Sequence, residues 1–574
     1  MLLLGRTKAL RGRGNAKFIL SALRSQSVSA AQSGDLDFSI NAVTDLFTDG
    51  SAEDEIHHVM LVAKSQYNMF KENVVRKLDN STLETIKGVS GIDLEKFPGS
   101  KVIKLEEQQY AMYDDQCSAG KVNFGDMFSQ IKDTKKVISF HAFGGAALEP
   151  RVANRLSYAW TVHNYKLTAF KRKRAAAKEE KDAKRIVWPA AADKNGVIGL
   201  ARATYLFRNL VDSPALTMGP AELAEVAEMV AKEHGCSAQT HVGVDALCSE
   251  GPGCFPQVAA VGMAAAPGRE PRVVEWTWGE DNKEGREVVI IGKGITFDTG
   301  GLNIKGPSMK GMKKDMAGSA QAIAMASWIM ATGLPCKLRV IIPIAENSVA
   351  GGALRPSDII RSRSGKTSEI TNTDAEGRLI LADALVAACE NPIDASEGVD
   401  KRRIIIDFAT LTGAARVALG GELPALFSND HAEMLELFAL SHDEDSCDSF
   451  EGIDPLWPLP LWEPMRGDLK SPLADIVNAP GTPGGAITAA LYLSEFVTPL
   501  TAGSSEASAY YRGGTGGSAA QDKEEDKGED KEEDKEDKED KEDKLAPIWF
   551  HVDFPGGKPG SMRAMYAYLN RKLR

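Results

Sequence analysis

Short β-branched runs alternate with helical stretches in the second half of the chain, and this alternation constrains the fold most strongly. The runs cover residues 287–291, 338–344 and 403–408 and are bounded by turns, which is typical of strands inside a parallel or mixed sheet. Helical patterns occupy the two intervals, over residues 319–332 and 379–390. The alternation predicts an α/β fold with helices on both faces of a mixed, largely parallel sheet.

The length of 574 residues exceeds what one hydrophobic core accommodates, so we expect two domains. Residues 35–165 contain short apolar runs between helical patterns, which predicts a smaller N-terminal α/β domain. A charged linking helix is predicted over residues 166–200, and the larger C-terminal domain over residues 201–574. The linker carries a basic run but no interleaved aromatic residues, so a nucleic-acid patch is the less favoured interpretation.

A low-complexity tract interrupts the C-terminal domain. Residues 522–544 hold fifteen acids against seven lysines, which accounts for −8 of the net charge of −12. The tract follows a Gly/Ser/Ala-rich segment and has no apolar residue that could join a core, so residues 503–544 are predicted to be a disordered, solvated insertion. The remaining charge of −4 gives no general attraction to nucleic acid.

The first 34 residues carry six basic residues and no acid before Asp35. Interleaved leucine and phenylalanine allow a basic amphipathic helix, so we predict a mitochondrial targeting extension; the alternative is a disordered extension on a cytoplasmic protein. The seven cysteines form no Cys-x-x-Cys pair, which is typical of free thiols in a reducing compartment. No apolar run approaches the roughly 20 residues that span a bilayer, so no membrane association is expected.

Two segments concentrate carboxylates and fixed cations. Residues 372–379 read Asn-Thr-Asp-Ala-Glu-Gly-Arg-Leu, which places Asp374 and Glu376 beside Arg378. An upstream segment, residues 290–318, adds Lys293, Asp298, Lys305 and Asp315. Crowded carboxylates repel one another unless divalent cations offset their charge, so the combination predicts a two-metal hydrolytic centre. Lys293 and Asp298 directly follow one predicted strand and residues 410–413 follow another, where α/β folds place their ligand sites.

Four ordered blocks carry a family resemblance. They are residues 292–301 with Lys305, residues 312–318, residues 372–379 and residues 409–414. With these blocks the chain resembles the leucyl aminopeptidase family of metallopeptidases, and the similarity extends from Arg208 to the C-terminus, about two thirds of the chain. The resemblance makes the C-terminal domain the catalytic one.

The resemblance implies a role for each motif residue. Asp298 and Glu376 would be shared by two divalent ions, Asp374 would complete one site, and Lys293 with Asp315 would complete the other. Ligation by Lys293 requires a neutral amine, hence a strongly depressed pKa. The ions would be Zn²⁺ or Mn²⁺, with Co²⁺ and Mg²⁺ as alternatives. Lys305 would polarise the scissile carbonyl and Arg378 would hold a bicarbonate that acts as base, while the substrate cleft would be lined by Met312, Thr410, Leu411 and Gly413.

The implied reaction is removal of N-terminal residues, leucine-like ones preferred, from peptides with a free N-terminus, and the implied assembly is a homohexamer. The C-terminal stretch departs from the family pattern: Pro555 and Lys558 replace small and apolar positions of the pocket for the first side chain, which puts strict leucine preference in doubt. Two alternatives stay open. One is a non-catalytic assembly or DNA-associated protein on the same scaffold, and the other is a different metal-dependent amidase or dipeptidase.

Overall fold

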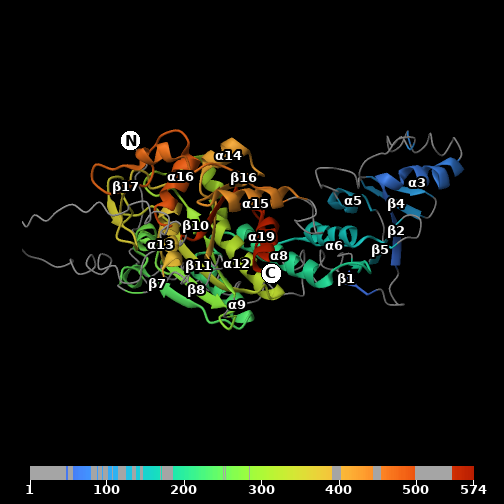
Figure 1. Cartoon of the computed structure of the whole chain (residues 1–574), viewed down its shortest axis with the longest axis horizontal. Coiled ribbons are helices and arrows are strands. Elements are labelled where there is room, and N and C mark those ends of the chain that lie inside the picture. The colour runs from blue at the N-terminus through green and yellow to red at the C-terminus, as the bar shows by residue number, and fades with distance from the viewer. Residues whose placement is uncertain are drawn as a thin grey trace, which may run out of the picture.

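Two α/β units of unequal size lie along the long axis of the molecule, the smaller one formed by the N-terminal segments (Figure 1). The structure is a computed structural model, and it describes residues 47–49, 56–78, 87, 94, 101–105, 108–113, 124–131, 137–142, 147–167, 170, 185–249, 251, 254–282, 285–390, 402–443, 454–497 and 546–574. The predicted targeting extension, most of the basic run and the predicted insertion lie outside the described residues.

A nine-stranded mixed sheet forms the centre of the larger unit, in the order β16-β15-β18-β14-β9-β11-β8-β7, with β10 paired to β11. The central strands β18, β14, β9, β11 and β10 are parallel to one another, whereas β15 pairs with β18, and β8 with β11 and β7, in antiparallel orientation. The predicted strands correspond to β9, β11 and β14, so the α/β prediction with a largely parallel sheet is confirmed. The bounds are β7 Gln239–Val242, β8 Arg272–Trp278, β9 Arg286–Gly292, β10 Gly294–Asp298, β11 Cys336–Asn347, β14 Ile404–Ala409, β15 Ala425–Ser428, β16 Trp457–Pro458 and β18 Ile548–Asp553.

Helices cover both faces of this sheet. Alternate residues of β9 point to opposite faces, so Val288 and Ile290 belong to one hydrophobic cluster and Val289 and Ile291 to another. The first cluster packs under α8 (Lys194–Asp212), α9 (Pro220–Glu233), α12 (Ala317–Thr332), α15 (His431–His442) and α19 (Met562–Leu573). The second packs under α10 (Val244–Leu247), α11 (Pro256–Gly262), α13 (Gly377–Cys389) and α16 (Gly485–Ser494). Buried on both sides, the strands need the near-continuous apolar sequence that predicted them.

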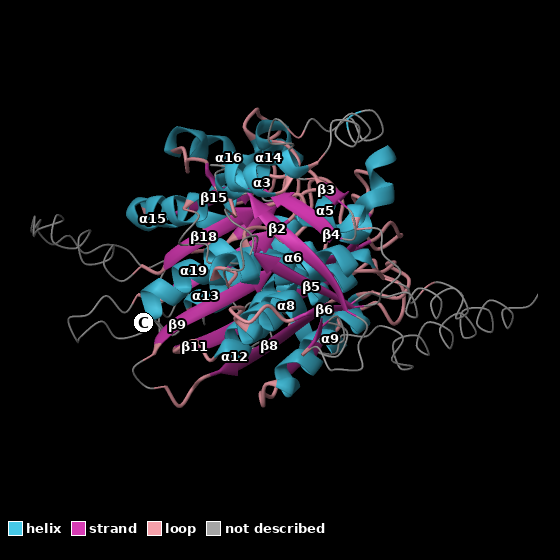
Figure 2. Cartoon of the chain, turned by 90° about the vertical axis from the view of Figure 1, so that its right-hand side faces the viewer, coloured by secondary structure: helices cyan, strands magenta, loops and turns pink. Residues whose placement is uncertain are grey.

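The smaller unit contains a six-stranded sheet in the order β1-β6-β5-β2-β4-β3, seen from its own side in Figure 2. Its strands are β1 Phe47–Thr48, β2 Ile56–Ala63, β3 Val102–Leu105, β4 Gln108–Tyr113, β5 Val137–Ala142 and β6 Arg185–Val187, and its helices include α3 Tyr67–Asn73, α5 Phe124–Gln130 and α6 Pro150–Asn164. Helix α6 packs on α8, so the apolar core of this unit is continuous with that of the larger one.

Strand β6 lies where a linking helix was predicted over residues 166–200. It pairs in parallel with β5, and its Ile186 is completely buried. This part of the predicted linker therefore belongs to the N-terminal sheet. Helix α8 then begins at Lys194. The charge of the preceding basic run favoured the prediction of a solvated helix. The short apolar run that follows it instead forms a strand between β1 and β5.

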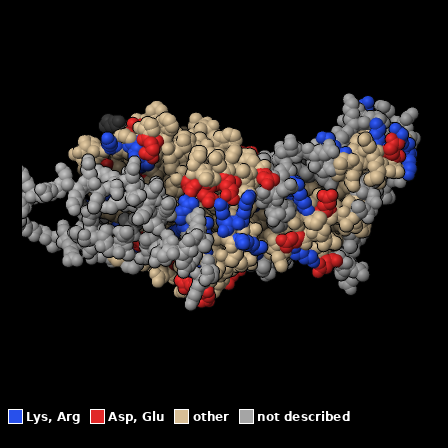
Figure 3. Space-filling view, viewed as in Figure 1, with Lys and Arg blue, Asp and Glu red and all other residues tan. Residues whose placement is uncertain are grey.

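The surface of the described residues carries charges of both signs. On the face drawn in Figure 3, Lys and Arg side chains lie beside Asp and Glu side chains near the junction of the two units. This mixture agrees with the small net charge of the chain outside its acidic tract. Among the described residues, no helix combines the length and apolar character needed to cross a membrane.

Candidate active site

Nearly all of the residues singled out in the sequence line one cavity of about 310 Å³ at the carboxyl ends of the central strands. Lys293 directly follows β9 and Asp298 ends β10. Asp315 follows the 3₁₀ helix η3 (Pro307–Lys314), Glu376 lies at the start of α13, and Thr410 begins the loop after β14. The residues from the prediction are Lys293, Asp298, Lys305, Met312, Asp315, Asp374, Glu376, Thr410, Leu411 and Gly413. Arg378 is the exception, since it is buried behind the cavity lining.

Three carboxylates form the floor of the cavity. Asp298, Asp315 and Glu376 are each at most 5% exposed, and one oxygen from each lies within 4.8 Å of the others. Lys293 Nζ lies 2.9 Å from Asp315 and 3.1 Å from Glu376. Four carboxylates, counting Asp374, therefore share two lysines, since Lys305 Nζ lies 2.7 Å from Asp298 and 2.5 Å from Asp374.

The charge balance of this cluster fits bound cations. Burial and the carboxylate of Asp298 raise the pKa of Glu376 to about 8, which shows how poorly the protein alone stabilises a further negative charge. The Oε2 atom of Glu376 has no hydrogen-bond partner among the described residues although it is buried. Buried carboxylate oxygens without partners are suited to hard divalent ions.

The charge of Lys293 depends on the carboxylates around it. Burial by itself lowers the pKa of this lysine, but the carboxylates of Asp315 and Glu376 outweigh burial, and the net effect is a raised pKa. The depressed pKa predicted for ligation by the neutral amine concerns the site with its ions bound, and it stays a prediction. The protein side chains therefore hold Lys293 as an ammonium, and a cation that uses the amine as a ligand has to displace its proton.

A glycine at the start of α12 fixes the position of Lys293. Ser319 N donates to Lys293 O at 2.9 Å and Lys293 N donates to Phe408 O at 2.9 Å, so the helix terminus is joined to the ends of β9 and β14. A Cβ atom on Gly318 would lie 2.1 Å from Phe408 O and 2.8 Å from Lys293 N. Only glycine permits this approach between helix and strands.

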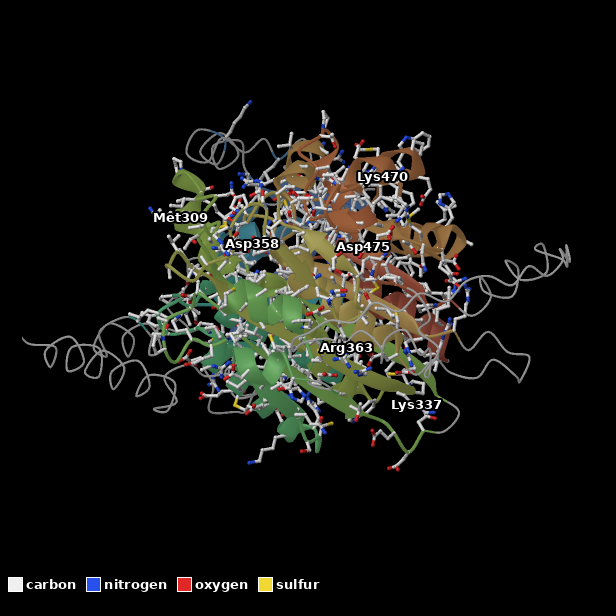
Figure 4. All side chains as sticks on the ribbon, turned by 90° about the vertical axis from the view of Figure 1, so that its left-hand side faces the viewer. Met309, Lys337, Asp358, Arg363, Lys470 and Asp475 are labelled. Atoms are coloured by element: carbon white, nitrogen blue, oxygen red, sulfur yellow. The ribbon has the colours of Figure 1, made fainter. Side chains whose placement is uncertain are left out.

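A small three-stranded sheet holds the loop of residues 371–378. It consists of β12 (Ile359–Arg361), β13 (Thr367–Glu369) and β17 (Ile476–Val477), and Figure 4 labels Asp358 and Asp475, which directly precede β12 and β17. Asn478, the residue after β17, accepts from Thr371 N at 2.9 Å and donates to Asn372 O at 2.7 Å. Sequence reasoning missed Asn478, because 106 residues separate it from the loop residue to which it donates.

Arg378 lies in the first turn of α13 behind this loop. Its Nη1 donates to Asn478 O at 2.6 Å, while its buried Nε has no hydrogen-bond partner in the described part of the chain. Burial lowers the pKa of this guanidinium. An unpartnered buried N–H suits a small anion, so the residue fits the bicarbonate that the resemblance implied.

Asp553 anchors the loop that follows β14. Its Oδ1 accepts from Leu411 N at 2.9 Å and its Oδ2 accepts from Thr412 Oγ1 at 2.6 Å. The register of β14 and β18 pairs Ala409 with Asp553, which brings this carboxylate to the loop. Sequence reasoning noted residues 551–558 only as a departure from the family and did not assign Asp553 to the site.

The cavity wall holds two cations that the sequence did not single out, Lys314 and Arg416. Lys314 Nζ donates to Pro555 O. Burial lowers the pKa of Lys314 and the positive charge of Arg416 lowers it further, while the carboxylate of Asp315 raises it. Pro555 lines the wall as predicted, but Lys558 does not: it pairs with Glu422 at 3.1 Å, with both side chains about three quarters exposed (75% and 74%).

The chain is similar in sequence to known proteins over its larger unit. A family model described as the cytosol aminopeptidase family, catalytic domain, matches residues 205–529. A probable cytosol aminopeptidase from Leifsonia xyli subsp. xyli is 40% identical over 301 residues, which is 52% of this chain and 56% of that protein. A second one, from Geobacter sp., is 39% identical over 306 residues, again 52% and 56%. The chain thus spans little more than half the length of these curated relatives.

Solved structures extend the likeness to both units. The crystal structure of a cytosol aminopeptidase from Coxiella burnetii has a TM-score of 0.70 at 29% identity and covers 92% of this chain and 100% of its own. A leucyl aminopeptidase from Trypanosoma brucei, in complex with actinonin, has a TM-score of 0.66 at 22% identity and covers 96% and 99%. The second likeness shows the fold alone.

Proposed function

The chain belongs to the cytosol aminopeptidase family, and from that premise we propose that it is a metal-dependent aminopeptidase that removes N-terminal residues from peptides. One observation carries the proposal: three buried carboxylates converge in a cavity where Lys293 and Lys305 pair with them. A protein that only assembled or bound DNA would gain nothing from this cluster, since uncompensated buried charge destabilises the fold.

We propose that the cluster holds two divalent ions, Zn²⁺ or Mn²⁺. Asp298 and Glu376 would be shared, Asp374 would complete one site, and Lys293 with Asp315 would complete the other. When bound, such ions activate water at neutral pH and polarise the scissile carbonyl.

Lys305 and Arg378 supply the remaining chemistry in this proposal. The Lys305 side chain is 15% exposed at the cavity, so its Nζ can reach a substrate carbonyl oxygen and donate to it as negative charge develops there. Buried Arg378 would retain a bicarbonate that takes a proton from the attacking water. Thr410, Leu411 and Gly413 would line the cleft, with the loop held by Asp553.

A free α-amine separates this function from the alternatives. The test is hydrolysis of a panel of aminoacyl amides by the metal-reconstituted protein, with Nα-acetylated copies of each substrate as matched controls. We expect cleavage of the free amines only. Equal cleavage of the acetylated copies would support a different amidase, and no cleavage by protein that retains its ions would support the non-catalytic alternative.

Metal binding is expected to release protons. The pKa of Lys293 is raised and the pKa of Glu376 is about 8, so both groups carry protons at neutral pH that an ion has to displace. The affinity for Mn²⁺ should therefore rise between pH 6.5 and pH 8.5, by up to about tenfold per pH unit for each proton released, and the contribution of Glu376 should level off above its pKa of about 8.

Calorimetry in two buffers of different ionisation enthalpy measures that release. Lys293→Met is the matched variant, because it removes one of the two protonated groups and should reduce the number of protons released. An affinity independent of pH over this range would contradict the assigned ligands.

We further propose that the chain assembles as a homohexamer. Support comes from the family resemblance alone, which implies this assembly. Light scattering should report a mass of six chains at micromolar concentration, and a monomer would contradict the proposal.

A further inference from the structure

Two cations of the cavity, Lys314 and Arg416, differ from its other lysines in their ion pairing within the described part of the chain. Lys293 and Lys305 each contact two carboxylates, but neither Lys314 nor Arg416 forms an ion pair with any residue that the structure describes. Both line the same cavity as the carboxylate cluster. Like charges that face one cleft repel each other. Asp315 offsets part of the charge of Lys314, and an anion bound beside the two cations would relieve the remaining repulsion.

Both cations are positioned by the elements that build the site. Lys314 ends η3 directly before Asp315, and its amine is held at the wall by the Pro555 carbonyl oxygen. Arg416 lies in α14 (Gly413–Leu419), which begins at the end of the loop held by Asp553. The same cavity is also lined by the apolar side chains of Leu423, Phe554 and Pro555. An apolar wall with two charged groups orients a ligand through those groups.

We propose that Lys314 and Arg416 form a carboxylate-binding subsite of the substrate cleft, so that the enzyme favours peptides that carry a carboxylate at this position. The inference rests on the proposed aminopeptidase function and names its substrate class. The planar guanidinium of Arg416 matches a carboxylate with two parallel hydrogen bonds, and Lys314 adds a point charge.

The carboxylate can come from two parts of a substrate. One is the side chain of an N-terminal aspartate or glutamate, and the other is the C-terminal carboxylate of a dipeptide. The cavity of about 310 Å³ lies at the small end of the range for ligand sites, so it suits a short ligand that presents either group.

The test compares kcat/KM within two substrate pairs that differ only in one charge. The first pair is glutamyl and glutaminyl amide, and the second is Leu-Gly and Leu-Gly amide. The protein is assayed with its metals, as wild type, as Arg416→Gln and as Lys558→Gln. Lys558 is the matched control, because it is a nearby exposed cation outside the cavity.

We expect the wild type to prefer the charged member of one pair by about tenfold, the size typical of a charge-assisted contact. Arg416→Gln should remove most of that preference, Arg416→Lys should restore part of it, and Lys558→Gln should leave it unchanged. Preference in the first pair identifies an acidic N-terminal residue, and preference in the second identifies the dipeptide terminus.

Three outcomes overturn the proposal. The subsite is wrong if leucyl amide is cleaved without charge preference in either pair, or if Arg416→Gln keeps the preference, or if Lys558→Gln loses it equally. Failure to cleave leucyl amide at all overturns the proposed function, and the subsite with it, so the two failures are distinguishable.

Discussion

Replacing Glu376 with alanine is expected to abolish peptide hydrolysis, with kcat falling at least about a thousandfold, or about 4 kcal/mol. Glu376 is 2% exposed and lies at the centre of the cluster, with Oε1 3.1 Å from Lys293 Nζ and Oε2 without a partner among the described residues. A ligand shared by two ions affects both when it is removed, so the loss exceeds that of one contact. The measurements are kcat on an aminoacyl amide and the number of ions bound per chain.

The Lys305→Met variant tests whether the rate of hydrolysis falls while the metal ions stay bound. Lys305 pairs with Asp298 and Asp374 but contributes no ligand in the proposed mechanism, so the variant should keep both ions while its rate falls by about 10²–10³-fold, as for other lost oxyanion donors. Retention of more than a tenth of kcat in Glu376→Ala, or loss of ions in Lys305→Met, would refute the assigned roles.

Gly318→Ala is expected to lower the free energy of unfolding by about 3–5 kcal/mol, at the upper end for single substitutions. The new Cβ would lie 2.1 Å from Phe408 O and 2.8 Å from Lys293 N. Both atoms belong to the backbone of central strands or their ends, so no flexible side chain can move aside, and α12 has to shift. Chemical denaturation measures the change.

Gly311→Ala is the matched control for that experiment. Gly311 lies in η3 near the same cavity, and a Cβ there meets no atom within 4 Å, so its effect on stability should be within about 0.5 kcal/mol. Equal stability of the two variants would contradict the close approach of α12 to the strands. The shift should also displace Lys293, so the Gly318 variant should bind metal more weakly than the control.

Local sequence patterns carried most of the architecture of the larger unit. The strands β9, β11 and β14 and the helices α12 and α13 lie where apolar runs and helical periodicity predicted them, within a few residues at each end. These patterns arise from burial on a sheet or a helix face, which each segment expresses in its own residues. The smaller unit was predicted less well, because β6 has only three residues and lies beside a highly charged run.

Some residues of the site were identified from the sequence, and others were found only in the structure. Asp298, Asp315 and Glu376 were identified because two short segments concentrate carboxylates beside lysines, and the fold brings the three carboxylates within 4.8 Å of one another. Asn478 and Asp553 have ordinary sequence surroundings, and only the pairing of β17 with β13 and of β18 with β14 gives them contact with the site.

By itself, the sequence determined that this chain has an α/β fold with a carboxylate-rich centre. Buried strands, helical periodicity and clusters of metal-ligating residue types can each be recognised within a short segment. Only the tertiary structure decided which cations face the cleft. The sequence predicted Lys558 in the pocket, but its side chain pairs with Glu422 at the surface. Lys314 instead donates to the carbonyl of Pro555, 241 residues away in the chain. The direction of a long side chain depends on what distant segments pack around it, and no local pattern encodes that arrangement.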